Sequence, residues 1–388
     1  SNSTSITIPT TGTGYNYEVD WDNDGNYDQS GITGNVTHNY GTAGTYTIRI
    51  RGRFPRIYFN SGGDRRKLLN ISQWGSIAWT SMENAFYGCS NLNITATDVP
   101  NLSGVNSMAK MFQACPSLNG PTNIGAWNTA TVTNMSYLFA GASSFDQPIG
   151  TWNTAAVTTM VSMFQSASIF NQPIGDWNTA AVTNMSSLFY EAFAFNQPIG
   201  DWNTAAVTTM FEMFRGAVSF NQPIGNWNTA AVTNMVSMFW DANSFDQPIG
   251  DWNTAAVTGM NFMFYGASSF DQPIGNWNTG AVTEMNFMFW GASSFNQPIG
   301  DWNVSAVIDG ERMFDGASSF NQSLGTWVFS PLVYLGNMLD NCGMDCANYS
   351  ATLHGWANNP ATPSGRWLGA LGRQYGTNAA SARETLAD

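Results

Sequence analysis

The stretch "FNQPIGDWNTAAVTNMSSLFYEA" (residues 170–192) indicates the fold, because nearly the same sequence recurs through the middle of the chain. Its tryptophan returns every 25 residues from Trp127 to Trp327, and an apolar pair such as Leu188-Phe189 returns with the same spacing. With the looser flanking copies this makes about eleven copies, and a fixed period of this length is typical of a solenoid. The sequence therefore predicts a stack of similar coils.

Each copy combines two local patterns. In V-T-x-M-x-x-M-F-x-x-A-x-x-F the apolar residues follow one another at steps of three and four, which predicts a short helical turn with one buried face. The following F-[ND]-Q-P-I-G-x-W segment is predicted to be extended, because proline fixes φ and removes a donor. The predicted class is an α/β repeat solenoid. We expect the asparagine after each tryptophan, such as Asn153, to form an amide ladder to the backbone of the next coil, and the same for the Gln147 column.

The ends of the chain differ from the repeats. Residues 1–52 alternate apolar and polar residues and predict a β-rich cap, and 53–80 form a connecting segment with the first coil. The repeats proper occupy 81–339. Residues 340–388 contain "CANYSATLHGWANN" and "SARETLAD", which predict a helical C-terminal cap. Capped ends are expected because a repeat array has to cover its open core.

Two resemblances follow from these residues. "MFYGASSFDQPIGNWNTGAVTEMNFMF" (residues 263–289) resembles the roughly 26-residue bacterial surface-protein repeat, which is similar to the BspA-like leucine-rich repeats. This resemblance implies a leucine-rich-repeat-like solenoid at the cell surface or outside the cell, and no known ligand. "WDNDGNYD" and "THNYGTAGTYTIRI", with His38/Tyr40 and Gly44/Tyr46, resemble part of a PKD domain.

Composition limits the partners. The 388 residues carry a net charge of −13, and 10% of them are charged, against about a quarter in ordinary soluble domains. Only Arg215 and Arg312 are basic between residues 124 and 327, so we expect no nucleic-acid binding. No run of 18 apolar residues exists, so we expect no membrane insertion. Whether a signal peptide or an anchor was removed stays open.

One acidic segment raises the question of a metal. Asp20, Asp22, Asp24 and Asp28 occupy offsets 1, 3, 5 and 9 of an EF-hand-type loop, with Gly25 at offset 6. Offset 12 is glycine rather than the bidentate glutamate. Calcium is the candidate ion, and an Asx-rich hairpin turn is the alternative.

Aromatic residues at variable positions suggest a binding surface. They lie near the core positions of the turn but outside them, and we name them the aromatic stripe: Tyr137, Tyr190, Phe211, Trp240, Phe262, Tyr265, Phe287 and Trp290. Aromatic rings can stack on sugars or anchor a protein partner. The alternative is that these rings only lean on one another and seal the surface.

The remaining chemistry is sparse. Two histidines and no nucleophile or phosphate-loop motif predict that the protein is not an enzyme. Cys89 and Cys115 share one repeat position, and Cys342 and Cys346 lie close in sequence, so disulfides and small buried thiols both stay open. The predicted function is a secreted or cell-surface adhesion module that binds a glycan or protein through the stripe. The alternative is a structural subunit of a stalk or fibre that self-associates.

Overall fold

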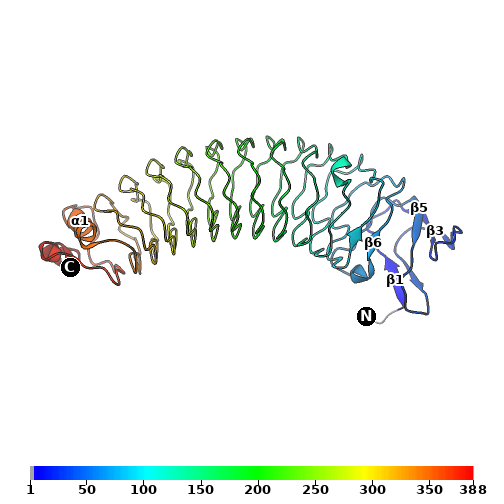
Figure 1. The fold of residues 1–388 in the computed structure, drawn as a ribbon, viewed down its shortest axis with the longest axis horizontal. Helices are drawn as coiled ribbons and strands as arrows, with labels where there is room; N and C mark the ends of the chain where they lie inside the picture. Colours follow the sequence, from blue (N-terminus) through cyan, green and yellow to red (C-terminus); the bar gives the residue numbers. More distant parts are fainter. Residues whose placement is uncertain (1–3, 388) are drawn as a thin grey trace. The chain divides into compact units, whose positions relative to one another are not determined.

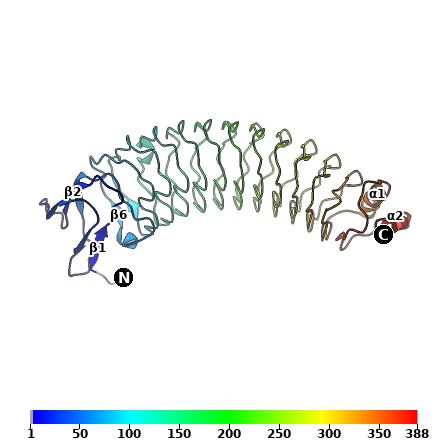
Figure 2. The same cartoon turned by 180° about the vertical axis from the view of Figure 1, so that it is seen from behind.

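The computed structural model describes residues 4–387. The chain forms two compact units, Ser1–Ala181 and Val182–Asp388, and the division falls inside the repeat array. Within each unit, successive repeats lie side by side (Figures 1 and 2).

The first unit begins with two small antiparallel sheets. One pairs β1 with β4, and the other has the strand order β3-β2-β5. The inner face of the larger sheet buries Tyr17 and Val19, and Phe54 packs edge-on against Tyr17 with ring centroids 4.9 Å apart. The strand bounds are β1 Ser5–Ile8, β2 Asn16–Asp20, β3 Gln29–Ile32, β4 Val36–Asn39 and β5 Arg49–Arg53.

The repeats of the first unit follow these sheets. Short strands β6 (Asn70–Ile71) and β7 (Asn93–Ile94) pair in parallel, and later repeats are joined by single parallel bridges such as Asn134 to Thr159. Two short 3-10 helices, η1 (Arg65–Lys67) and η2 (Ile124–Ala126), interrupt the segment. Parallel pairing at a fixed offset brings equivalent residues of neighbouring repeats together.

The predicted helical turn of each repeat is wrong. In the second unit the amide of Met213 donates to the carbonyl of Met210 at 3.1 Å, whereas the amide of Phe214 donates to Met238 of the next repeat at 2.9 Å. Glu212, the third residue of the turn from Met210 to Met213, has φ of 53°. These are the features of a type II β-turn. Steps of three and four residues fit both a helix and a run of turns, and bonding between repeats selected the turns.

Columns of buried side chains fill the interior of the second unit. Trp227, Trp252 and Trp277 stack with centroids 6.3 and 6.5 Å apart, and each indole Nε1 donates to an isoleucine carbonyl of the preceding repeat, as Trp252 does to Ile224 at 3.2 Å. A column of buried threonines, which the repeat pattern did not predict, bonds to the following repeat. Thr254 Oγ1 donates to the carbonyl of Asn278, one repeat further on, at 2.9 Å.

The asparagine column does not form the predicted ladder, whereas the glutamine column does join neighbouring repeats. Asn228, the residue after a tryptophan, accepts from the amide of Ala230 within its own repeat at 3.1 Å. The residue before the glutamine of each repeat joins the repeats instead. Asn221 Oδ1 accepts from the backbone amide of Asp246 at 3.0 Å and from Gln247 Nε2 at 2.9 Å.

The second unit ends in two helices, α1 (Cys346–Ala357) and α2 (Ala380–Ala387), with η3 (Thr377–Ala379) before α2. Asp345 caps α1 by accepting from the amide of Asn348 at 2.8 Å. On this helix, Trp356 Nε1 donates to the carbonyl of Leu324 at 2.8 Å and so continues the tryptophan ladder at the end of the array. Across residues 4–387, every helix is too short or too polar to cross a membrane.

Candidate functional site

Five residues of the aromatic stripe form one continuous stack in the second unit. Tyr265 lies between Trp240 and Trp290, with ring centroids 4.5 and 4.4 Å away. Beside them, Phe262 stacks on Phe287 at 4.9 Å and on Trp240 at 5.1 Å. We call these five residues the aromatic stack. They come from three successive repeats, whose parallel pairing places equivalent positions side by side.

An arginine extends the aromatic stack by one more repeat. The Arg215 guanidinium lies 3.9 Å from the ring centre of Trp240 and 5.3 Å from that of Tyr190, so it occupies the place of a ring in the same column. Arg215 also forms an ion pair with Glu212 at 2.5 Å. Trp240 Nε1 donates to Asp241 at 3.0 Å. Polar groups therefore border the rings at this end of the stack.

The rings of the aromatic stack are half-buried rather than fully exposed. Burial raises the pKa of Tyr265, and at Tyr190 burial raises the pKa more than the nearby Arg215 lowers it. Phe262 and Phe287 also have positive φ values of 59° and 57°. Such values are strained for bulky residues and are ordinarily taken by glycine or asparagine. The aromatic side chains therefore occupy turn positions that disfavour them.

Three residues of the stripe lie outside the stack, and one of them, Tyr190, is separated from it by Arg215. Tyr137 belongs to the first unit, where its ring centre lies 5.4 Å from Lys110 Nζ. Phe211 is one position earlier in its turn than Phe262. Its carbonyl accepts from the amide of Ser187, and the equivalent bond two repeats later joins the carbonyl of Asn261 to the amide of Ser237, so Phe211 corresponds to Asn261. Sequence spacing grouped all three with the stack. Tyr137 holds the same turn position as Phe262, with φ of 58°, but belongs to the other unit, whereas Phe211 lies out of register.

The predicted metal-binding segment is only partly brought together. One carboxylate oxygen from each of Asp20, Asp22 and Asp28 lies within 4.8 Å of the others. Asp24 lies outside this group and accepts from the amide and side chain of Asn26 at 2.7 and 3.0 Å. Asp20 is fully buried, and its two oxygens accept from the amides of Asn23 and Gly25. These bonds are the Asx-turn pattern of the alternative interpretation, and calcium binding stays a prediction.

A hollow of about 490 Å³ adjoins these carboxylates and is bordered by Trp21, His38 and Tyr40. The His38 ring stacks on Trp21 at 4.8 Å, and the Tyr40 hydroxyl donates to the carbonyl of Trp21 at 2.7 Å. Burial, and then the ring of Tyr46 and the three carboxylates, raise the pKa of Tyr40 to about 12.

We expect Tyr40 to ionise near pH 12, against an ordinary value of about 10. Because its pKa is raised in the folded state, its contribution to stability is complete below pH 10 and is lost as the pH rises toward 12. Ultraviolet absorbance of tyrosinate in wild type and Tyr40→Phe identifies this titration. In Asp22→Asn it should move to lower pH, and a titration near pH 10 in wild type would contradict the expected burial.

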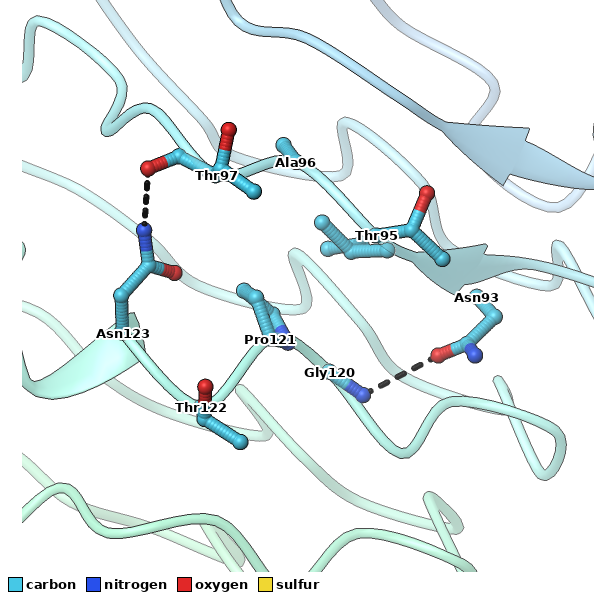
Figure 3. A pocket seen from close by; sticks show the side chains of 9 residues that line it. Asn93, Thr95, Ala96, Thr97, Gly120, Pro121, Thr122 and Asn123 are labelled. Atoms are coloured by element: carbon cyan, nitrogen blue, oxygen red, sulfur yellow. Dashed lines mark hydrogen bonds between the residues drawn. The ribbon is translucent and has the colours of Figure 1, made fainter.

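A second hollow, of about 360 Å³, lies between two early repeats of the first unit (Figure 3). Asn123 Nδ2 donates to the carbonyl of Thr97 at 2.9 Å, and the amide of Gly120 donates to Asn93 Oδ1 at 3.1 Å. The nine residues that line it carry no ionisable side chain. The hollow coincides with a longer repeat, since 27 residues separate Phe112 from Phe139 and the regular spacing is 25.

The four cysteines are free thiols in the structure. Cys89 and Cys115 are buried, and Cys115 Sγ lies 3.1 Å from the carbonyl oxygen of Phe86 as its hydrogen-bond donor. Burial raises the pKa of Cys115 to about 12 and also raises that of Cys89. Thiols of this kind are poor nucleophiles. Cys342 is buried and Cys346 is exposed at the start of α1.

Comparison with known proteins identifies one family. The family model described as "Mycoplasma protein of unknown function, DUF285" matches three overlapping stretches in tandem, residues 80–195, 171–270 and 247–352. Together they span more than half of the chain and include the whole aromatic stack. No curated protein matches the chain.

Proposed function

The chain belongs to the DUF285 family of tandem-repeat proteins, and from this premise we propose that it is a non-enzymatic adhesion or recognition module that binds its partner through the aromatic stack. The finer architecture is part of the proposal. It is a leucine-rich-repeat-like solenoid of about eleven coils with a PKD-like cap, acting at the cell surface or outside the cell. The parallel bridges between repeats support this architecture.

The observation that carries the proposal is the column Tyr190, Arg215, Trp240, Tyr265 and Trp290. Tyrosine, tryptophan and arginine are the residues most enriched among those that dominate the energy of protein interfaces. Rings held in a stack lose little further freedom on binding. The charged groups of Glu212 and Asp241 beside the column match the usual polar rim of an interface.

The covered ring faces favour a protein partner over a glycan. A sugar ring binds an aromatic residue by lying on its face. Both faces of Tyr265 are taken by Trp240 and Trp290, and Arg215 covers one face of Trp240. This part of the surface therefore exposes ring edges rather than ring faces. A protein partner can bury ring edges through shape complementarity.

We expect the fourfold variant Phe262→Ser, Tyr265→Ser, Phe287→Ser and Trp290→Ser to lose binding to intact cells by at least about tenfold, as expected when several central interface residues are removed. Binding of the labelled full chain to a panel of cell types measures this effect. Protease treatment of the cells should abolish wild-type binding, whereas periodate oxidation of their glycans should leave it. The reverse pattern would assign the stack to a glycan.

A matched control makes the same aromatic-to-serine substitution at a surface position outside the aromatic stack. Phe193→Ser removes an aromatic side chain that is 46% exposed and lies outside the stack. This variant should bind like wild type. Equal loss in the control and in the fourfold variant would contradict a role for the stack.

The second candidate function is a structural subunit that self-associates. The half-buried rings of the stack support it, because apolar edges can pair with the same surface of another copy. Light scattering across protein concentration distinguishes the two functions. If wild type assembles without a ligand and the fourfold variant does not, a structural subunit is favoured. If wild type and the fourfold variant are both monomeric, recognition is favoured.

A further inference from the structure

The segment from residue 49 to residue 67 has the opposite charge to the rest of the protein. It holds seven of the 13 lysines and arginines and a single carboxylate, Asp64, in a chain of net charge −13. By contrast, residues 182–340 contain 13 carboxylates and only Arg215 and Arg312. Such separation of charge favours contact between the oppositely charged parts of different molecules.

Strand β5 presents part of this positive charge on an open edge. It is the outer strand of the sheet β3-β2-β5. Phe54, just after the strand, packs in the core, so alternation places Arg49, Arg51 and Arg53 on the opposite face. All three arginines are exposed. The strand therefore carries a row of guanidinium groups toward solvent.

Most of these cations have no carboxylate partner. Among residues 4–387, Arg51 forms an ion pair with Glu18 and Lys67 forms one with Asp64. The other five cations of the segment have no ion pair within the described chain: Arg49, Arg53, Arg56, Arg65 and Arg66. An acidic protein thus leaves its main concentration of positive charge unneutralised.

The complementary surface is a column of carboxylates on the repeats of the second unit. Asp201, Asp251 and Asp301 stand directly before the ladder tryptophans of alternate repeats and are exposed. None of the three has an ion pair within residues 4–387. The tryptophans that follow these carboxylates are spaced at 6.3 and 6.5 Å per repeat, so alternate members of the column are about 13 Å apart. Arg49 and Arg53 are about 14 Å apart along their strand. Two long arginine side chains can span this difference.

We propose that the basic row on β5 binds the Asp201–Asp251–Asp301 column of a second copy of this chain. Because the two surfaces differ, the contact is heterologous: one copy keeps its acidic column unused and the other keeps its basic row unused. Such contacts add copies one after another until a ring closes or a filament forms. This inference rests on the second candidate function, self-association, and supplies it with a contact distinct from the aromatic stack.

The test reverses charge on each surface separately. We expect wild type at 50 mM salt to show a weight-average mass at least twice the 42.2 kDa of the monomer, and to dissociate at 500 mM salt, where screening is strong. The variant Arg49→Glu/Arg51→Glu/Arg53→Glu and the variant Asp201→Lys/Asp251→Lys/Asp301→Lys should each be monomeric in light scattering. An equimolar mixture of the two should assemble again, because it restores one native contact and one reversed contact.

Controls keep this result distinct from the function proposed above. Circular dichroism verifies that both variants are folded, and Arg383→Glu, a charge reversal at an exposed site elsewhere, should assemble like wild type. A wild type that stays monomeric at 50 mM salt overturns the contact. If the assembly resists salt and only the fourfold stack variant fails to assemble, the protein self-associates through the aromatic stack. This result also overturns the contact between β5 and the carboxylate column. A monomer that binds a sulfated polysaccharide through Arg49 and Arg53 would assign the row to an external polyanion instead.

Discussion

Phe264→Ala is expected to lower the free energy of unfolding of the second unit by about 3–5 kcal/mol, the usual range for removing a fully buried phenylalanine. Phe264 is 0% exposed and stacks on Phe239 at 5.6 Å, on Phe289 at 5.5 Å and on Phe270 at 4.0 Å. Its removal opens a cavity that neighbouring repeats can fill only by breaking their shared register. Urea unfolding followed by circular dichroism and by tryptophan fluorescence measures the loss.

The control lies two residues away in the same turn. Phe262→Gly removes a half-buried ring of the aromatic stack but relieves a left-handed backbone, which costs non-glycine residues about 1–2 kcal/mol. We expect a net change of about 1 kcal/mol or less in either direction, because lost stacking and relieved strain offset each other. A loss as large as that of Phe264→Ala would make the aromatic stack part of the core and remove the argument that it serves binding.

Asn221→Ala is expected to destabilise the second unit by about 2 kcal/mol, because two part-buried donors lose their acceptor. The Asn221 side chain accepts from the backbone amide of Asp246 and from Gln247, so both donors of the next repeat lose their partner. Asn221→Asp keeps the acceptor oxygen and should retain most of the stability. The chain itself carries aspartate at the equivalent Asp246 and Asp271, which accept in the same way.

Thermal melts of Asn228→Ala provide the comparison. Asn228 bonds to Ala230 inside its own repeat at an exposed turn, and its loss should cost about 1 kcal/mol or less. Equal effects at Asn221 and Asn228 would contradict the assignment of the ladder between repeats to the Asn221 column. The ratio of the two effects therefore tests which amide column joins neighbouring repeats.

The repeat and its interior could be predicted from the amino-acid sequence. A tryptophan, an isoleucine, a methionine and two phenylalanines that return every 25 residues can be buried together only if equivalent positions lie side by side. Residues such as Trp252, Phe264 and Phe270 are indeed buried in columns. Period and hydrophobicity carry this information because burial depends on side-chain type and on spacing alone.

Only the tertiary structure decided the local conformation and the surface. The pattern around Met210 and Met213 suits a helix as well as a type II turn, and bonds from Phe214 to the next repeat made the choice. The same bonds fixed the register that brings Phe262 and Tyr265 into the aromatic stack and leaves Phe211 outside it. Asp24 separated from Asp20, Asp22 and Asp28 because its carboxylate bonds to Asn26. Spacing along the chain does not encode such contacts, since they depend on which backbone groups find partners in a neighbouring repeat.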